Sequence, residues 1–335
     1  MSDLLKTLPD DAREKLRKTP QPAWISPMLA TLTHKYFSSP DWIFELKFDG
    51  ERCLTFRRGA ELRLMSRNAI VMNDQYPELV AALAKQPQTD FIVDGEIVAF
   101  AGKITSFARM QGRMHISNPP PSLIKEIPVF YYLFDLLYLD GYDVTRLPLR
   151  QRKDLLKRAI VFKDPLRYTE HRERDGLAYH REACRMGWEG IIAKRADSRY
   201  VARRSPDWLK FKCVNEQELV IGGYTDPQGS RIGFGALLVG YYEGGKLHYA
   251  GRVGTGYDEE TLARLHDMMR KLETDERPFV ERDFPRRGIH WIKPKLVAQV
   301  GFAEWTPDGK LRHPRFLGLR DDKQPREVVR ETPGV

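Results

Sequence analysis

The sequence predicts two consecutive domains, a larger α+β domain and a smaller C-terminal β-barrel. The chain of 335 residues is longer than a single hydrophobic core usually supports. Strand-like runs alternate with helical patches up to residue 213, whereas glycine-punctuated β segments dominate from residue 214 onwards. We therefore expect an N-terminal arm over residues 1–22, the α+β domain over residues 23–213 and the barrel over residues 214–335.

The arm is expected to hold one short helix, with Asp10 and Asp11 at its N-terminal end, where acidic side chains interact favourably with the helix dipole. In the α+β domain, Gly59 and Ala60 predict the turn of a hairpin that begins near Arg52. Apolar periodicity predicts helices at residues 77–85, 149–159 and 175–186.

The barrel is expected to contain about five strands and one helix, a combination that suits a small Greek-key barrel of the OB type. The predicted helix covers residues 259–272. The clearest strand-like segments are residues 219–224, 235–242, 247–253 and 296–305.

Composition favours a polyanionic partner, because the net charge is +9 and the sequence pI is near 9.3. The longest apolar stretch, residues 129–139, is shorter than the roughly 20 residues of a membrane-spanning helix and contains Asp135. The charged N-terminus lacks the apolar run of a signal peptide, so the cytosol is the expected compartment. Cys53, Cys184 and Cys213 match neither a disulfide framework nor a zinc-ligand spacing, and we expect them to be buried apolar side chains.

Residues 42–48 are predicted to form a strand with one apolar and one charged face. Alternation places Glu45, Lys47 and Asp49 together, opposite the aromatic and leucine side chains. Gly50 then turns the chain. The charged face is a candidate reactive surface, although a lysine in this pattern also fits a solvated strand.

Three further strand-like segments present charges or rings beside apolar residues. Glu96 lies within an apolar run, so it needs either a ligand or a salt bridge to an arginine. Phe134 fits either a core position or a ring that stacks on a purine. Lys210 and Lys212 alternate on one strand face and repel each other unless an anion lies between them, as a nucleotide phosphate would; a solvated edge strand is the alternative.

Taken in order, a series of short motifs resembles that of the covalent nucleotidyltransferases over about residues 22–325. Residues 311–323, which are rich in cations, resemble the ligase module of bacterial ligase D. The motifs are Lys47-Phe48-Asp49-Gly50 with Arg52, Ser66-Arg67-Asn68, Asp94-Gly95-Glu96, Phe134-Asp135, Glu189-Gly190 with Lys194, Lys210-Phe211-Lys212 and Arg320-Asp321-Asp322-Lys323. The resemblance implies an ATP-grasp-like DNA ligase nucleotidyltransferase domain, followed by an OB-fold domain that rotates during the reaction cycle.

Motif position also implies a role for each residue. Lys47 is implied to be the nucleophile that becomes adenylylated. The implied nucleotide contacts are Glu45 to the adenine amino group, Leu46 beside it, Phe134 stacked on adenine, Glu96 to the ribose hydroxyl, and Arg52 and Arg67 to ribose, phosphate or the DNA 5′ end. The implied phosphate and metal contacts are Lys194, Lys210 and Lys212 to the α-phosphate, Arg320 and Lys323 to pyrophosphate, and Glu189 to a metal ion with help from Asp49 or Glu96.

The implied reaction is lysyl-AMP formation from ATP, transfer of AMP to a DNA 5′-phosphate and sealing by the adjacent 3′-hydroxyl. Mg²⁺ or Mn²⁺ is expected because carboxylates bind hard cations. Lysine attacks as a free amine although its ordinary pKa is about 10.4, so we expect the neighbouring lysines and the metal ion to disfavour the protonated form of Lys47.

The resemblance implies a monomeric, stand-alone DNA ligase of the bacterial cytosol that acts in DNA repair near the nucleoid. Its expected substrate is nicked or broken duplex DNA, with a Ku-type end-binding protein as a candidate partner. Two alternatives stay open: an RNA ligase or mRNA-capping guanylyltransferase, and a non-catalytic, basic OB-type DNA-binding protein.

Overall fold

The computed structural model describes residues 2–331 except 214, 228, 230, 282, 283 and 285–287. Contacts divide the chain into two compact units, the first containing Met1–Cys213 and the second Val214–Thr332. The first unit is built on two sheets and the second on one larger sheet and a short two-stranded one. Each unit has its own hydrophobic core.

The larger sheet of the first unit has eight strands in the order β1-β9-β8-β6-β4-β5, with β10 paired to β8 and β7 to β6. Its strands are β1 (Arg17–Lys18), β4 (Glu51–Arg58), β5 (Glu61–Ser66), β6 (Asp90–Ala101), β7 (Ile104–Thr105), β8 (Val129–Leu139), β9 (Tyr142–Asp143) and β10 (Leu166–Tyr168). The predicted hairpin is confirmed, because β4 and β5 pair with Arg58 opposite Glu61. The long apolar stretch at residues 129–139 is strand β8.

The second sheet of this unit has five strands in the order β11-β3-β12-β13-β2. They are β2 (Leu29–Leu32), β3 (Trp42–Leu46), β11 (His171–Glu173), β12 (Gly190–Arg195) and β13 (Arg204–Lys212). The predicted alternation is confirmed: Phe44 and Phe211 lie in one apolar cluster, whereas Trp208 lies in another cluster together with Phe134 of the first sheet. The face that carries Glu45 and Trp208 is therefore turned toward the larger sheet.

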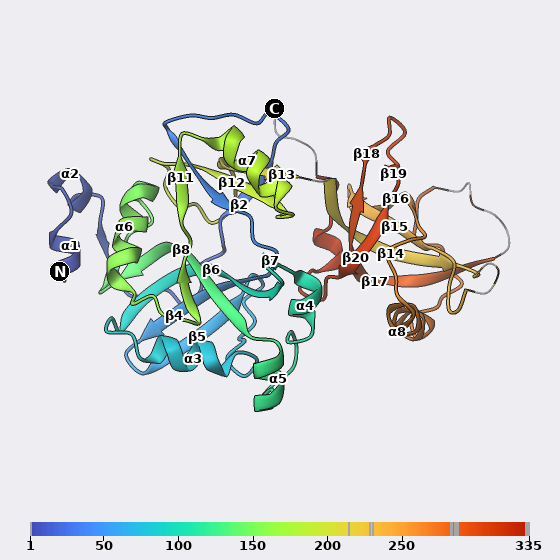
Figure 1. Ribbon diagram of the computed structural model, residues 1–335, viewed down its shortest axis with the longest axis horizontal. Helices are drawn as coiled ribbons and strands as arrows, with labels where there is room; N and C mark the ends of the chain where they lie inside the picture. Colours follow the sequence, from blue (N-terminus) through green and yellow to red (C-terminus); the bar gives the residue numbers. More distant parts are fainter. Residues whose placement is uncertain are drawn as a thin grey trace. The chain divides into compact units, whose positions relative to one another are not determined.

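Helices cover the outer sides of these sheets. In Figure 1, α3 (Pro77–Ala84) lies beside β4 and β5, and α6 (Leu149–Ala159) lies beside β8. α7 (Gly176–Arg185) packs against β12 and β3. All three predicted helices are thus present with ends within about two residues, the usual precision of boundaries read from sequence. Two shorter helices of this unit are α4 (Phe107–Gln111) and α5 (Pro121–Glu126).

The first residues differ from the single helix that the sequence predicts. They form two one-turn helices, α1 (Asp3–Lys6) and α2 (Asp10–Arg13), and then β1, which pairs with β9. Pro9 separates the helices, since proline has no backbone N–H to continue a helix and here precedes the first turn of α2. Leu5, Leu8 and Ala12 are buried in the core of the first unit.

The second unit contains a five-stranded antiparallel sheet in the order β16-β15-β14-β17-β20 and a two-stranded sheet of β18 and β19. Its strands are β14 (Asn215–Thr225), β15 (Leu237–Glu243), β16 (Lys246–Val253), β17 (Ile289–Phe302), β18 (Glu304–Trp305), β19 (Leu311–Arg312) and β20 (Arg315–Leu319), and its helices are α8 (Glu259–Arg270) and η1 (Pro325–Glu327). In the described part of the chain, no ladder joins β16 to β20, which agrees with a curled, partly open barrel of the OB type.

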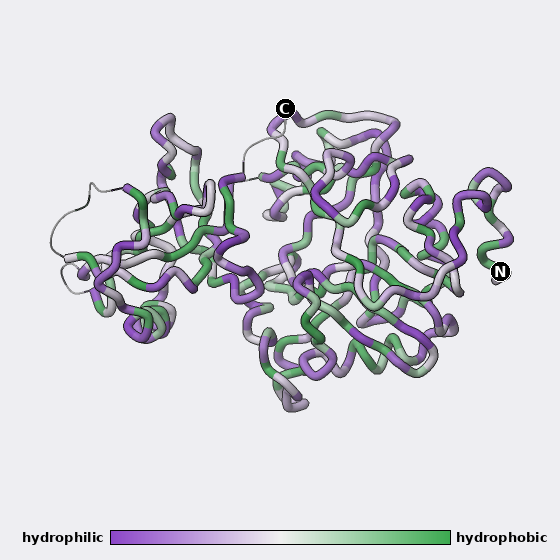
Figure 2. Tube along the Cα trace, turned by 180° about the vertical axis from the view of Figure 1, so that it is seen from behind, coloured by the Kyte–Doolittle hydropathy of each residue, from purple (hydrophilic) through white to green (hydrophobic). Residues whose placement is uncertain are grey.

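Helix α8 packs one apolar face on the core of the second unit. Asp258 caps it by accepting a hydrogen bond from the backbone N–H of Thr261. Leu262, Leu265 and Met269 are buried at helical spacing. Figure 2 shows green and purple residues mixed along this helix, as expected for a helix with one face on the core. Among the described helices of the chain, none is long and apolar enough to span a membrane.

The cysteine expectation is wrong for two of the three residues. Cys53 is buried with a free thiol, as expected. Cys184, on α7, and Cys213, which follows β13, form a disulfide instead. They are separated by 29 residues, and the packing of α7 on the second sheet brings them together, so their spacing in sequence carries no signal of the pairing.

Candidate active site

Lys47 stands at the end of β3, where the chain passes from the second sheet into the larger one. Its backbone N–H donates to the carbonyl oxygen of Gly190 on β12 at 2.9 Å, which extends the β3–β12 ladder by one residue. Gly50 then makes a close approach to β6: a Cβ at this position would lie 2.2 Å from the carbonyl oxygen of Ile97. The Lys-Phe-Asp-Gly motif is therefore a link between sheets that requires glycine at its last position.

A single carboxylate connects two of the predicted catalytic lysines. The ammonium of Lys47 donates to Glu189 Oε2, and Lys212 Nζ lies 3.8 Å from Oε1 of the same side chain. Only 9% of the Glu189 side chain is exposed, whereas 21% of the Lys47 side chain is exposed. Lys47 is therefore the accessible member of a largely buried group. Lys210 is half-buried and faces Ile192 on β12.

Glu45 lies deeper, on the same strand face as Lys47. Its two carboxylate oxygens each contact a different ammonium, Lys153 Nζ at 2.5 Å and Lys194 Nζ at 2.5 Å, and all three side chains are 2% exposed. Burial acts to raise the pKa of Glu45, but the two ammonium groups outweigh burial and hold that pKa below its ordinary value. Glu45 is thus a permanently ionised hydrogen-bond acceptor in the interior.

Lys194 lies against two aromatic rings. Its Nζ is 4.1 Å from the ring centroids of both Phe134 and Trp208, which themselves meet edge to face. Burial lowers the pKa of Lys194 to about 8, with Glu45 opposing the shift and Lys153 adding to it. The family resemblance implies that Lys194 contacts the α-phosphate. In this structure its ammonium contacts Glu45 and the Phe134 ring, at the end of the site where adenine is expected.

Arg52 forms a salt bridge with Asp94 that the sequence analysis did not identify. Its Nε and Nη2 each donate to one oxygen of Asp94 at 2.6 Å, and Tyr200 donates its hydroxyl to Asp94 at 2.7 Å. Burial acts to lower the pKa of Arg52, but Asp94 dominates and raises it. The guanidinium carbon lies 4.7 Å from the centroid of the Phe134 ring. Asp94, the partner of Arg52, is fully buried, whereas Glu96 is half-buried and lies opposite Arg52 in the β4–β6 ladder.

Local contacts explain the positions of three other predicted residues, Asp49, Arg67 and Leu46. Asp49 Oδ2 accepts a hydrogen bond from the backbone N–H of Phe107 at 3.0 Å, at the start of α4. Arg67 is half-buried in the turn after β5, where the Ser66 hydroxyl accepts backbone N–H groups. The Leu46 side chain packs with the apolar cluster under α7, on the face opposite Glu45. Only the backbone of Leu46 is therefore placed to contact a nucleotide.

The carboxylates present suit Mg²⁺ or Mn²⁺ by chemical type, since both ions prefer oxygen ligands. In the described part of the chain, no three carboxylates converge as a ready-made cation site. Glu189, Glu96 and Asp49 are the candidate carboxylates, and all three are partly buried.

Arg320 and Lys323 belong to the second unit and are described within it. Arg320 donates through Nε and Nη2 to the two oxygens of Asp322 at 2.8 Å. Glu218 lies 3.1 Å from Lys323 Nζ and 3.6 Å from Arg320 Nη1. Burial acts to raise the pKa of Asp322, but Arg320 outweighs it and lowers that pKa. The Arg-Asp-Asp-Lys motif is therefore a compact ion-pair cluster at the end of β20.

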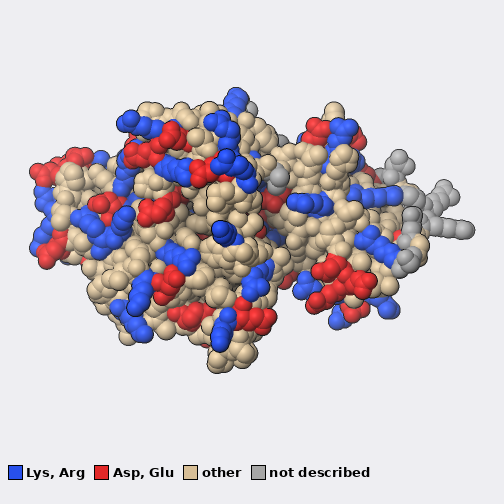
Figure 3. All heavy atoms as spheres, in the orientation of Figure 1, with Lys and Arg blue, Asp and Glu red and all other residues tan. Residues whose placement is uncertain are grey.

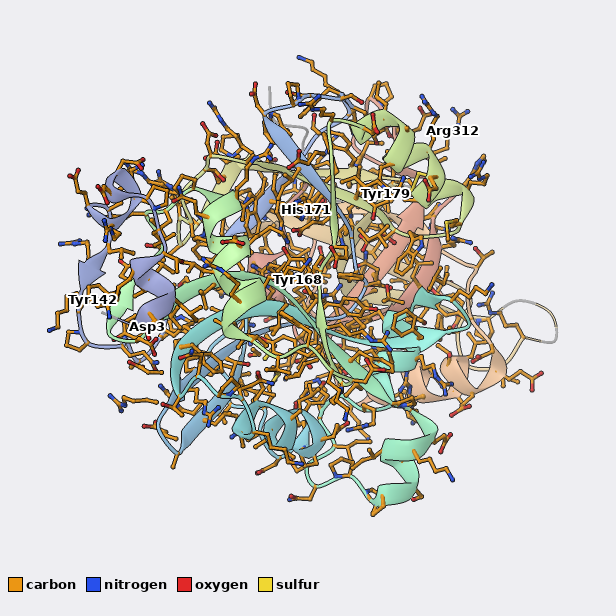
Figure 4. The ribbon with its side chains drawn as sticks, turned by 60° about the vertical axis from the view of Figure 1, so that its left-hand side comes forward. Asp3, Tyr142, Tyr168, His171, Tyr179 and Arg312 are labelled. Carbon is orange, nitrogen blue, oxygen red and sulfur yellow. A yellow bond between two sulfur atoms is a disulfide. The ribbon has the colours of Figure 1, made fainter. Side chains whose placement is uncertain are left out.

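Lys153 is a site residue that the sequence analysis missed. It donates to both Glu45 and the carbonyl oxygen of Thr169, and its Nζ is 4.7 Å from the Tyr168 ring centroid. Figure 4 labels Tyr168 and His171, from β10 and β11, near the centre of the first unit, and His171 pairs with Glu45 in the β11–β3 ladder. A signal was present: on α6 the buried positions include two adjacent cations, where an amphipathic helix ordinarily has apolar residues.

Comparison with known proteins agrees with both units. Residues 27–212 match the family model "ATP dependent DNA ligase domain", and residues 230–323 match the model "ATP dependent DNA ligase C terminal region". A solved structure described as mycobacterial DNA ligase D complexed with ATP and MES superposes with a TM-score of 0.65 at 38% identity, covering 92% of this chain and 98% of that one.

Curated relatives include the multifunctional non-homologous end joining DNA repair protein LigD of Mycobacterium tuberculosis, which is 40% identical over 92% of this chain. A probable DNA ligase of Dictyoglomus thermophilum is 31% identical over 85% of this chain. The chain spans 40% of the length of the first relative and 54% of the second. Both family models match this chain, and they match in the family's order. The motif lysine lies at the junction of the two sheets. This chain therefore belongs to the ATP-dependent DNA ligases.

Proposed function

We propose that this chain is an ATP-dependent DNA ligase that seals 5′-phosphate/3′-hydroxyl breaks through AMP carried on Lys47. The observation that carries the proposal is the contact of Lys47 with Glu189, which also approaches Lys212. An accessible amine, a carboxylate in hydrogen-bond contact with it and further ammonium groups nearby are the parts that nucleophilic attack on a phosphate requires.

The first step uses these groups directly. The Lys47 nitrogen bonds to the α-phosphorus of ATP, and the bond from that phosphorus to the pyrophosphate oxygen breaks. Lys47 attacks as the free amine, and the protons that its nitrogen loses pass to solvent. Lys210 and Lys212 stabilise the negative charge of the phosphate, and Arg320 and Lys323 are proposed to orient the leaving pyrophosphate.

The buried part of the site around Glu45 and Phe134 is proposed to select the base of the nucleotide. Glu45 is ionised and accepts hydrogen bonds, so it favours the 6-amino group of adenine over the 6-oxo group of guanine. Phe134 offers a ring for stacking, and Arg52 and Glu96 are proposed to contact the ribose or phosphate. Adenine in this position displaces the ammonium of Lys194 from the Phe134 ring.

A divalent cation is proposed to bind at Glu189, with Glu96 or Asp49 as further candidates. Bound there, Mg²⁺ or Mn²⁺ supplies positive charge to the triphosphate. Glu189 cannot serve Lys47 and a cation through the same lone pairs, so cation binding is expected to weaken its contact with Lys47 and favour the neutral amine.

The DNA substrate is proposed from the names of the relatives and from charge. Relatives named for non-homologous end joining suggest broken duplex DNA as a substrate beside nicks, with a Ku-type protein as a candidate partner. The net charge of +9 supports phosphate binding. On the face in Figure 3, cationic and acidic side chains are interspersed, so this face does not mark a single track for DNA. We further propose a monomer of the bacterial cytosol, associated with the nucleoid.

The proposal is tested by incubating the protein with ATP labelled at the α-phosphate. Wild-type protein is expected to retain the label after denaturation, and Lys47→Ala to retain none. Lys85→Ala, at an exposed residue that ends α3, is the matched control and should label normally. Label retained in Lys47→Ala removes the mechanism.

Substrate class is tested with the same protein in sealing assays. Nicked DNA, nicked RNA and blunt DNA ends are supplied with ATP or with GTP. Sealing of nicked DNA with ATP alone is expected. Labelling by GTP in preference to ATP would indicate capping chemistry, and sealing confined to RNA nicks would indicate an RNA ligase. An intact protein that neither labels nor seals would indicate a DNA-binding module without activity.

A further inference from the structure

A pair of cysteines lies at the point where the first unit ends. Cys184 occupies the last turn of α7, and Cys213 is the last residue of the first unit. Their Cα atoms are 5.2 Å apart, within the range of disulfides in proteins, and the two sulfurs are bonded. Both residues are only partly buried, so small molecules in solution can reach them.

This pair is joined to the active site through the backbone around Lys212. The N–H of Cys213 donates to the carbonyl oxygen of Glu189 at 3.0 Å, and Glu189 is the carboxylate that contacts Lys47. The carbonyl oxygen of Lys212 accepts the hydroxyl of Tyr36 at 2.8 Å. A covalent bond at Cys213 therefore fixes the strand end from which the Lys212 side chain projects.

His180 connects the same elements from the helix side. It precedes Cys184 by one helical turn on α7, and its Nε2 lies 3.4 Å from Cys184 Sγ and 3.3 Å from the carbonyl oxygen of Lys212. Its ring is also 4.3 Å from that of Tyr36. His180 thus contacts both Cys184 and the backbone of Lys212.

From this geometry we infer that Cys184 and Cys213 are a reversible modification site, oxidised by low-molecular-weight disulfides, whose state adjusts the position of Lys212. Disulfides in proteins of reducing compartments are most often transient and regulatory. The coupling to Lys212 rests on the proposed ligase function, whereas formation of the bond does not.

The exchange is balanced as two thiol–disulfide steps. Cys184, after losing its thiol proton to solvent, attacks one sulfur of a small disulfide RSSR and releases RS⁻. Cys213, deprotonated in the same way, then attacks the Cys184 sulfur of the mixed disulfide and releases a second RS⁻. Both RS⁻ ions take up the released protons, so two protein thiols and RSSR give one protein disulfide and two RSH.

The oxidised form is the one in which Glu189, Lys47 and Lys212 are assembled here. Reduction removes one of several restraints on Lys212, because Tyr36 and His180 still contact its backbone. We therefore expect self-adenylylation with ATP to be about threefold slower in the reduced protein, far less than the roughly 100-fold that a 1 Å misplacement can cost.

The test equilibrates the full chain in buffers of oxidised or reduced glutathione, alkylates free thiols and maps peptides by mass spectrometry. A Cys184–Cys213 linked peptide is expected after oxidation, with Cys53 still free. The same samples are assayed for labelling by ATP, in wild type, Cys184→Ser, Cys213→Ser and the control Cys53→Ala. Both serine variants should label at the reduced rate in either buffer, and Cys53→Ala should respond as wild type does.

Several results would overturn the inference. The first is that both cysteines remain alkylatable after oxidation. The second is that linkage forms but leaves the labelling rate unchanged, which removes the coupling to Lys212. The third is that the reduced protein binds added Zn²⁺ in stoichiometric amount through His180 and both thiols, which makes the cluster a metal site. Absence of ATP labelling in every sample, with linkage intact, would instead contradict the proposed ligase function.

Discussion

Arg152 and Lys153 are neighbours on α6, both cationic and both buried, yet they serve opposite kinds of site. Arg152 turns toward β8 and forms a bidentate salt bridge with Asp135, in which Nε donates to Oδ1 at 2.7 Å and Nη2 donates to Oδ2 at 2.9 Å. Its Nη1 donates to the carbonyl oxygens of Leu147 and Ser198. Positive and negative charges balance one to one, and both side chains are 0% exposed.

Lys153 turns instead toward the second sheet, where two ammonium groups share the one carboxylate of Glu45. This group carries an excess positive charge, and Lys194 has its pKa lowered to about 8 as a result of burial. Charge balance separates the two roles. A balanced, hydrogen-bonded pair fixes the fold, whereas an unbalanced group is suited to receive an anionic or electron-rich ligand.

The largest effect is expected from breaking the balanced pair. Arg152→Met leaves Asp135 buried without its cation, and removal of one partner from such a pair costs about 3–5 kcal/mol. The free energy of unfolding, measured with denaturant, should fall by that amount. ATP labelling of the remaining folded protein should be unchanged. Unaltered stability would show that the Asp135 contact is not a structural anchor.

An intermediate effect is expected at the unbalanced group. Lys153→Met removes one of the two cations on Glu45 but leaves Lys194, so the stability loss should be smaller than for Arg152→Met. The KM for ATP in self-adenylylation should rise about tenfold, the scale of one lost charge-assisted hydrogen bond. Lys157→Met, at an exposed residue one turn further along α6, is the control and should leave KM unchanged. A large stability loss with an unchanged KM would place Lys153 with Arg152 as a structural residue.

A third effect is a pH dependence of stability from Lys194. Because its pKa is lowered from 10.5 to about 8 in the folded chain, the folded state releases this proton before the unfolded state does. Below pH 8 both states hold the proton and the burial cost is present in full. Between about pH 8 and 10.5 the unfolded state binds more protons, so wild type should gain stability relative to Lys194→Met as pH rises. A constant difference between the two proteins across this range would contradict the lowered pKa.

Much of the fold could be predicted, because local sequence patterns determine it. Periodicity or turn chemistry within a short segment predicts the helix at residues 149–159, the Gly59–Ala60 hairpin and the two faces of β3. The first residues were predicted less well, since two one-turn helices and a two-residue strand are held by contacts with the core rather than by their own pattern.

In the site, motif residues could be named but their partners could not. Lys47, Glu189 and Lys212 were predicted, and the structure brings these three together. The pairing of Arg52 with Asp94 was not predicted, because the side-chain contacts of neighbouring strands depend on register and depth. The Cys184–Cys213 bond and the contact of Lys153 with Glu45 join residues far apart in sequence, so only tertiary packing reveals them.

Lys47, and no neighbouring lysine, is expected to become bonded to AMP. The wild-type protein is incubated with ATP and Mg²⁺ and digested, and AMP is located by tandem mass spectrometry. We expect AMP on the peptide that contains Lys47, and none on the peptides that contain Lys194, Lys210 or Lys212. AMP on one of those three lysines, or an equal yield of AMP in Lys47→Ala, would show that Lys47 is not the nucleophile.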